Sequence, residues 1–235
     1  MDYQAKLTDF VERARKALGE RLQAVVLYGS AATGEYDEGR SDLNLLLLAS
    51  GLDLAELRSL RPLCEWWQEQ GHSWPLLFTP EEYRSSADAF PMEQMDIAAA
   101  HRVLFGAFDF GPPQVTREVH RAQVEHEVRA KVLRLRQKGI LLVEDSKELL
   151  RLVENSLSTF LVLLRHVLLL EGHAPPFARL ELLQLAAGLG YETEALKTVL
   201  ALRRGQVSPK SIDSVQLFES YLQQVQALAA RVDLL

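Results

Sequence analysis

The residues best suited to phosphate chemistry lie between Leu27 and Leu48. Gly29 and Ser30 follow a short apolar run, and Gly34 comes after the turn that they begin. Glycine tolerates positive φ and lets a ligand approach the backbone closely. The amides at Ser30 and just after it are expected to open a helix, whose free N–H groups would hold a phosphate group. Gly29 and Ser30 are therefore the predicted phosphate-binding residues.

Two oxygen-bearing side chains, Asp42 and Asn44, come after the polar loop 35–41, where the next apolar run begins. Side chains alternate along a strand, so these two share one face while Leu43 and Leu45 take the other. Carboxylate and amide oxygens beside a phosphate group suit Mg²⁺ held partly by protein and partly by substrate. The sequence therefore predicts a magnesium site with Asp42 and Asn44 as ligands.

The elements that must position these residues change character near residue 113. Before it, apolar runs at 25–28, 43–48 and 76–78 predict buried strands. Helical patterns cover 3–18, 54–69 and 80–87, and Asp53 is a plausible N-cap of the second. Strands separated by helices favour crossover connections and a small mixed sheet.

The segment Gly111-Pro112-Pro113 interrupts this alternation. After it the pattern is almost wholly helical, at 115–138, 146–170, 178–189, 193–203 and 211–232, with Gly139 as the first helix breaker. Antiparallel helices on short connections form a bundle. The expected organisation is an α/β (α+β) domain over 1–113 and an all-α helical bundle over 114–235.

Gly29-Ser30 together with Ser41-Asp42-Leu43-Asn44 resembles the nucleotidyltransferase superfamily that includes DNA polymerase β and kanamycin nucleotidyltransferase. The family pattern is Gly-Ser, a short helix and loop, then Asp-x-Asp on the next strand. The order of sheet domain and helical bundle is similar to the two-domain plan of kanamycin nucleotidyltransferase. The resemblance implies the nucleotidyltransferase fold, a nucleoside triphosphate ligand with Mg²⁺, and Asp42 and Asn44 as catalytic positions.

The chain departs from this family at three places. The family often has an arginine in the helix after Gly-Ser, where this chain has Ala31 and Ala32. Asn44 stands where the family has its second aspartate, and an amide binds Mg²⁺ without contributing charge. The family usually takes a third carboxylate from a later strand, but the corresponding segment, 72–78, contains no Asp or Glu. Two Mg²⁺ ions roughly 3.5–4 Å apart repel by about 17 kcal/mol at an effective dielectric constant of about 20. One well-held ion is therefore better supported than two.

Other charged residues allow two interpretations each. Asp88, Glu93 and Asp96 could replace the missing carboxylate, or they could be solvated or capping groups. The segment 115–138 holds seven Arg or Lys residues and three Glu residues. These cations could form a solvated face with i,i+4 ion pairs, or some could hold a triphosphate or an acidic partner.

The net charge, the cysteine count and the apolar stretches restrict the partners and the location that are expected. The net charge of −6 gives no global attraction to nucleic acid or anionic membranes. The single cysteine, Cys64, cannot form an internal disulfide and favours a reducing compartment, so a cytoplasmic location is expected. The N-terminus lacks the apolar region of a secretory signal. The apolar stretch 157–170 is too short to span a bilayer and predicts a buried helix.

Two functions fit this sequence. One is an active nucleotidyltransferase that moves a nucleoside monophosphate from Mg-NTP to a hydroxyl of a small molecule or protein. The other is a nucleotide-binding protein with the same fold, a degenerate metal site and weak or lost transfer activity, in other words a pseudoenzyme. Its bundle would then serve as a homodimer or protein-partner surface. The absent carboxylates favour the second function.

Overall fold

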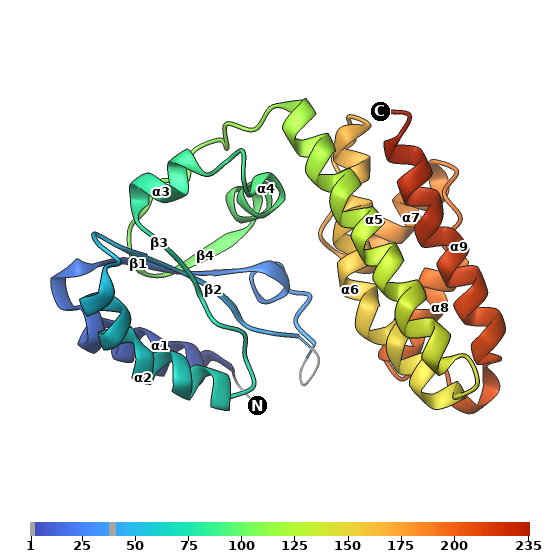
Figure 1. Cartoon of the computed structure of the whole chain (residues 1–235), viewed down its shortest axis with the longest axis horizontal. Coiled ribbons are helices and arrows are strands. Elements are labelled where there is room, and N and C mark those ends of the chain that lie inside the picture. The colour runs from blue at the N-terminus through green and yellow to red at the C-terminus, as the bar shows by residue number, and fades with distance from the viewer. Residues whose placement is uncertain (1–2, 38–40) are drawn as a thin grey trace. The chain divides into compact units, whose positions relative to one another are not determined.

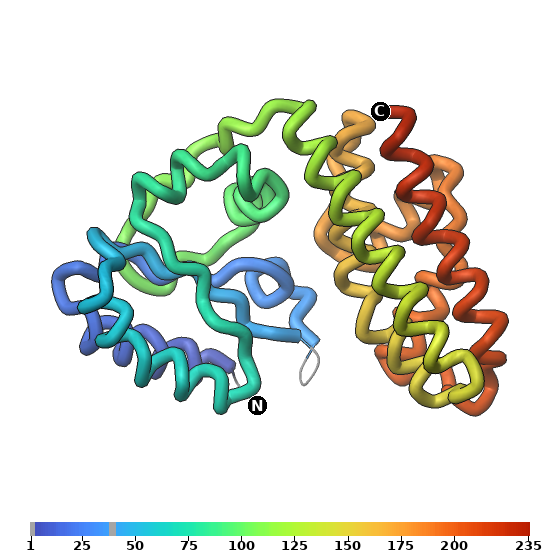
Figure 2. Tube along the Cα trace, viewed as in Figure 1, coloured from blue at the N-terminus to red at the C-terminus, as the bar shows by residue number. Residues whose placement is uncertain are grey.

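The computed structural model describes residues 3–37 and 41–235. The chain forms two compact units, Met1–Thr116 and Arg117–Leu235 (Figure 1). Residues 107–116, which contain no helix or strand, connect them along the chain (Figure 2). Positions 38–40 of the predicted polar loop 35–41 lie outside the described residues.

The first unit is built on a four-stranded sheet in the order β3-β2-β1-β4. The strands are β1 (Leu22–Tyr28), β2 (Asn44–Ala49), β3 (Leu76–Phe78) and β4 (His101–Gly106). β1 is antiparallel to both β2 and β4, whereas β2 and β3 are parallel and are connected through a helix. The predicted mixed sheet is therefore confirmed.

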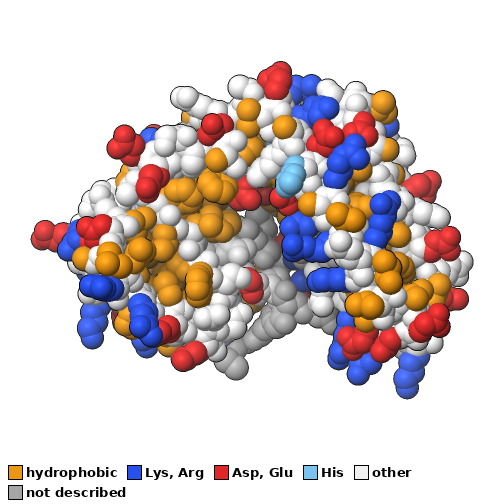
Figure 3. Space-filling view, in the orientation of Figure 1, with side chains coloured by type: hydrophobic (Ala, Val, Ile, Leu, Met, Phe, Trp, Pro, Cys, Tyr) orange, Lys and Arg blue, Asp and Glu red, His pale blue; other side chains and the backbone are white. Residues whose placement is uncertain are grey.

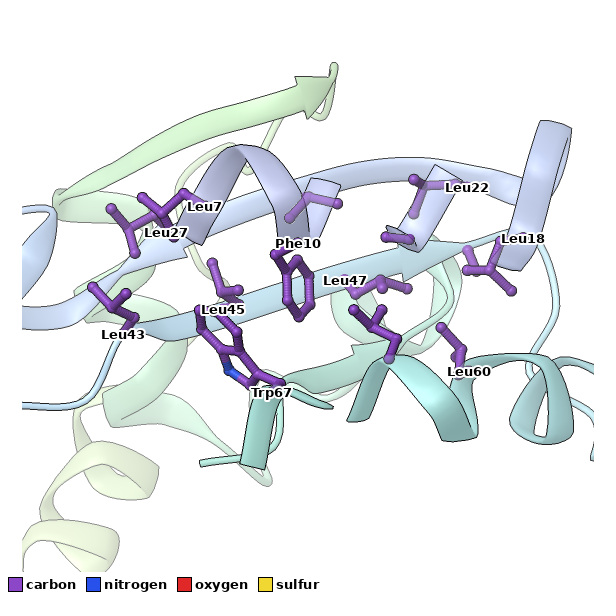
Figure 4. Packing of buried hydrophobic residues seen from close by; sticks show 14 of the residues in the cluster. Leu7, Phe10, Leu18, Leu22, Leu27, Leu43, Leu45, Leu47, Leu60 and Trp67 are labelled. Carbon is purple, nitrogen blue, oxygen red and sulfur yellow. The ribbon is translucent and has the colours of Figure 1, made fainter. Parts of the chain in front are cut away.

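Helices α1 (Tyr3–Leu18) and α2 (Leu54–Glu69) cover one face of this sheet. Figure 4 shows Leu7 and Phe10 of α1 and Leu60 and Trp67 of α2 packed over the strand residues Leu45 and Leu47. α2 begins at the predicted N-cap, because the Asp53 carboxylate accepts a hydrogen bond from the Ala55 amide at 2.8 Å. This layer includes Leu27, Leu43 and Leu45, next to the ends of β1 and β2 where the predicted site lies.

A second cluster lies on the other face of the sheet, where Val26, Leu46 and Leu48 contact Tyr83 and Ile97. It involves α3 (Pro80–Ser85) and α4 (Pro91–Ala99). α3 begins with a capping box at Thr79 and Glu82, and it ends two residues before the predicted end. The sequence predicted neither α4 nor β4. β4 lies at the sheet edge, and its first three residues are exposed, so it lacks the apolar run of a buried strand.

The second unit is a helical bundle, as predicted. Its helices are α5 (Arg117–Leu142), α6 (Ser146–Leu170), α7 (Arg179–Gly188), α8 (Glu194–Arg203) and α9 (Ser214–Val232). The prediction that Gly139 breaks a helix is wrong, because α5 continues to Leu142. Gly139 is buried, and a Cβ there would lie 2.5 Å from Cζ of Phe218. The glycine makes room for an aromatic ring against the helix backbone.

α6 is the central helix of the bundle. By length and composition it is the one helix of the described chain that could cross a membrane, and 61% of its most apolar window is buried within the structure. Its buried residues include the polar Arg165 and His166. Packing in the bundle core accounts for its apolar character, in agreement with the buried helix predicted from the sequence.

Candidate functional site

The turn after β1 has the glycine conformation that the sequence predicted. β1 ends at Tyr28, and Gly29 follows with φ of 71°. The expected helix is shorter than predicted, since Gly29–Ala31 is a single 3-10 turn. The Gly29 carbonyl accepts from the amides of Ala32 and Thr33 at 3.0 and 3.2 Å. The Ser30 amide and hydroxyl have no hydrogen-bond partner within the described residues, so both donors are available to a ligand.

Gly29 and Asn44 lie against each other across β1 and β2. The register pairs Tyr28 with Asn44, which places the Asn44 side chain beside the turn. A Cβ at position 29 would lie 2.8 Å from the Asn44 amide nitrogen, so a larger residue would displace that side chain. The close approach and the positive φ both require glycine at this position.

Asp42 lies two residues before β2 rather than within it, and its side chain is exposed. Its Oδ2 accepts a hydrogen bond from the Ser73 hydroxyl at 2.6 Å. The neighbouring Leu43 amide donates to Nδ1 of His72 at 3.4 Å. These contacts arise because β2 and β3 are parallel, so the segments that precede the two strands lie side by side. The sequence predicts only that the segment 72–78 lacks carboxylates, and no local pattern indicates the contact of Ser73 with Asp42.

His72 is a buried neutral group next to this pair. Burial lowers its pKa, Lys6 adds to that effect, and Asp42 opposes it. Because Nδ1 accepts from the Leu43 amide, the ring proton resides on Nε2. Nε2 is buried and has no partner among the described residues. His72 therefore supports the backbone before β2 without adding a charge beside Asp42.

Asn44 lies on the sheet face opposite α1 and α2. Leu43 and Leu45 belong to the cluster under those helices, as the predicted alternation requires. Leu46 and Leu48 belong to the opposite cluster, and Tyr28 packs against that cluster as well. The structure thus brings Gly29, Ser30, Asp42 and Asn44 to one end of the β1–β2 pair.

The sequence matches no protein-family model and no curated protein. Among solved structures, the chain is similar to spectinomycin adenyltransferase AAD(9) from Enterococcus faecialis, whose structure was determined with ATP and spectinomycin. The TM-score is 0.56 at 12% identity, over 94% of this chain and 99% of that chain. The chain has a nucleotidyltransferase fold. A toxin–antitoxin structure with AMP-PNP matches 58% of this chain and 95% of that chain at 16% identity, with a TM-score of only 0.30.

In this nucleotidyltransferase fold, α4 brings a carboxylate near the Asn44 face. Burial and, to a smaller extent, the negative charge of Glu93 together raise the pKa of Tyr28 to about 12. Glu93 therefore acts electrostatically on a residue whose register partner is Asn44. Asp88 is exposed between α3 and α4, and Asp96 lies one helical turn after Glu93. Of the three carboxylates considered as replacements, Glu93 is the one whose charge contributes to the raised pKa of Tyr28.

Metal-binding groups are sparse in the described part of the chain. Within residues 3–37 and 41–235, no three His, Cys, Asp or Glu side chains gather so that they could hold a metal ion. Asp42 and Asn44 together offer one carboxylate and one amide. Any divalent ion at this end of the sheet would need further oxygen ligands from a bound molecule.

Proposed function

We propose that this protein binds a Mg²⁺-nucleoside triphosphate at the end of β1 and β2, with weak or lost nucleotidyl transfer. The observation that carries the proposal is the contact of the Gly29 turn with Asn44, beside the exposed carboxylate of Asp42. AAD(9), which shares the fold, was solved with ATP, and this supports a nucleotide as the ligand.

Gly29 and Ser30 would bind the phosphates in this proposal. The positive φ of Gly29 turns the chain sharply, and the Ser30 amide and hydroxyl remain unpartnered within the described residues. Backbone N–H groups in such a turn form an anion-binding concavity. Binding through the backbone also removes the need for an arginine after Gly-Ser, where this chain has Ala31 and Ala32.

Asp42 and Asn44 would hold one Mg²⁺ ion. Both supply oxygen ligands, which Mg²⁺ prefers, and Ser73 occupies only Oδ2 of Asp42. When bound, the ion neutralises phosphate charge and polarises the phosphoryl group. A second ion would find no further carboxylate from β3, whose residues are Leu76, Leu77 and Phe78. This shortage of negative charge is the reason for proposing weak or lost transfer.

An active transferase is the alternative, and Glu93 is the observation that favours it. Its charge reaches Tyr28, which lies next to Asn44 on the sheet. A carboxylate from α4 would then take the role that β3 cannot fill. The acceptor would be a hydroxyl of a small molecule or protein.

Calorimetric titration of ATP and GTP, with Mg²⁺ and with EDTA, tests the binding proposal. We expect Mg²⁺-dependent binding that Asp42→Asn weakens by about tenfold or more, equivalent to about 1.4 kcal/mol. The matched control is Asp9→Asn, which makes the same charge change at an exposed α1 residue paired with Arg13. If no nucleotide binds the wild type, or if both variants lose affinity equally, the proposal is wrong.

Transfer is measured as pyrophosphate release from labelled ATP, with spectinomycin and the protein itself as trial acceptors. We expect no turnover by the wild type and tighter Mg²⁺-nucleotide binding by Asn44→Asp. Turnover by the wild type that Glu93→Gln abolishes would establish the active alternative. Turnover that Glu93→Gln leaves unchanged would refute both the degenerate site and the role of Glu93.

A further inference from the structure

A small basic groove lies within the bundle, between α5 and α6. It encloses about 220 Å³, and Lys131, Arg134 and Lys138 of α5 line one side. These positions are three or four residues apart, so they share one face of the helix. Figure 3 shows Lys and Arg side chains gathered on the bundle where α5 lies in Figure 1.

The cations of α5 differ in whether they form ion pairs or hydrogen bonds with other described residues. Outside the groove, Arg121 and Arg129 both pair with Glu125, and Arg129 also reaches Asp233 at 2.6 Å. In the groove, Lys131 pairs with Glu127 at 3.3 Å. Arg134 and Lys138 have neither an ion pair nor a side-chain hydrogen bond within the described residues. The solvated-face interpretation thus fits Arg121, Arg129 and Lys131, whereas Arg134 and Lys138 are without a partner in the described part of the chain.

α6 contributes neutral hydrogen-bond donors to the same groove. The Asn155 amide and the Thr159 hydroxyl also lack partners within residues 3–37 and 41–235. Ser156, by contrast, donates to the Val153 carbonyl at 3.0 Å and lies 2.9 Å from the hydroxyl of buried Tyr221. Ser156 therefore already has its hydrogen-bond partners, whereas Asn155 and Thr159 have none among the described residues and can donate to a ligand.

The charge and size of the groove restrict the ligand. The described residues that line it include no Asp or Glu. Leu135 and Phe160 give it an apolar part. Sites for drug-sized ligands usually exceed about 300 Å³, so 220 Å³ suits a phosphate or pyrophosphate group or the phosphorylated end of a small compound.

We infer that this groove binds a phosphate-bearing small molecule, with Arg134 and Lys138 as the charged donors and Asn155 and Thr159 as neutral donors. Guanidinium and ammonium groups form charge-assisted hydrogen bonds to phosphate oxygens, which are roughly twice as strong as neutral ones. The groove shares no residue with the β1–β2 site, so this inference is independent of the proposed function.

Calorimetry on the full-length protein at constant ionic strength tests the inference. The probes are inorganic phosphate, pyrophosphate and glucose 6-phosphate, without Mg²⁺, and sulfate is the competing anion. We expect one of the phosphate probes to bind, and Arg134→Gln with Lys138→Gln to weaken it at least about tenfold. The probe that binds most tightly distinguishes a free phosphate from a phosphomonoester.

The matched control is the pair Arg58→Gln and Lys147→Gln, which removes the same charge from exposed residues that form no ion pair with any other described residue. If both double variants lose the same affinity for the phosphate probe, the loss is explained by net charge alone and the inference is overturned. Asn155→Asp, which places a carboxylate in the groove, should abolish binding, and unchanged binding would contradict the assigned location. Equal affinity for sulfate, or no binding of any phosphate probe, would also refute it. Circular dichroism verifies that each variant is folded.

Discussion

The β1–β2 site and the interior of the bundle both contain polar groups, but these groups differ in whether they have hydrogen-bond partners within the described residues. At the site, the donors of Ser30 and the side chain of Asn44 have no partner within the described residues. In the bundle, the buried His120 and His166 hydrogen-bond to each other at 2.8 Å. Burying a polar group without a hydrogen bond costs free energy of folding, whereas a partly exposed polar group can hydrogen-bond to water until a ligand binds. The donors at the site thus remain available within the described residues, whereas the histidine pair connects α5 to α6.

The tautomers of this histidine pair follow from its neighbours. Arg165 can only donate, and it lies 3.5 Å from Nε2 of His166. His166 then carries its proton on Nδ1 and donates it to Nε2 of His120. An additional proton on Nε2 of His120 would turn the acceptor of this hydrogen bond into a donor and would place a positive charge in the buried pair. Burial and His166 both lower the pKa of His120, to about 4.

Acidification should give the largest effect, and it should act on the bundle. The folded-state pKa of His120, about 4, lies below the value of about 6.5 expected in the unfolded chain. Stability from this group is thus fully present above pH 6.5 and is lost as the pH falls towards 4, by up to about 3 kcal/mol. Urea unfolding at pH 7, 5.5 and 4 measures this loss.

The two units can be followed separately in that experiment. All three tryptophans, Trp66, Trp67 and Trp74, belong to the sheet unit. Far-UV circular dichroism should report the loss of the bundle helices at lower urea as the pH falls, with a smaller shift in tryptophan fluorescence. His120→Leu should flatten the pH dependence. If the two signals shift equally in the wild type, the assignment of acid sensitivity to the bundle fails.

Gly29→Ala should give an intermediate effect on the sheet unit and a strong one on binding. An alanine at φ of 71° costs about 1–2 kcal/mol, and its Cβ would contact the Asn44 amide at 2.8 Å. Gly34→Ala is the control, because Gly34 has φ of 79° but no atom within 4 Å of the added Cβ. Both should lower the urea midpoint, but Gly29→Ala alone should abolish nucleotide binding. Equal binding by the two would exclude the Gly29–Asn44 contact from the site.

Ser73→Ala should give the smallest of these effects. It removes the 2.6 Å hydrogen bond to Asp42, and a bond to a charged group contributes about 1.5 kcal/mol or more when well shielded. Exposure reduces this value, so we expect about fivefold weaker Mg²⁺-nucleotide binding in calorimetry. Ser59→Ala, on the exposed face of α2, is the control. An unchanged affinity in Ser73→Ala would show that Asp42 needs no support from the segment before β3.

Local patterns predicted a large part of the fold. The bounds of 3–18, 54–69, 146–170 and 76–78 agree with α1, α2, α6 and β3. Apolar periodicity and capping residues such as Asp53 act within a few residues, so a single sequence carries them. The sequence predicted a helix end at Gly139, but glycine occurs there because a Cβ would collide with Phe218, a residue far along the chain. The sequence did not predict β4, because a strand at the sheet edge needs no apolar alternation.

The sequence by itself determined the turn at Gly29, the alternation that separates Asn44 from Leu43 and Leu45, and the shortage of carboxylates in β3. Each of these follows from residue type and from neighbours along the chain. Only the tertiary structure decided that Ser73 contacts Asp42, that the charge of Glu93 contributes to the raised pKa of Tyr28, and which cations of α5 have no partner among the described residues. Those facts depend on parallel pairing and helix packing between distant segments, and no local pattern encodes a long-range register.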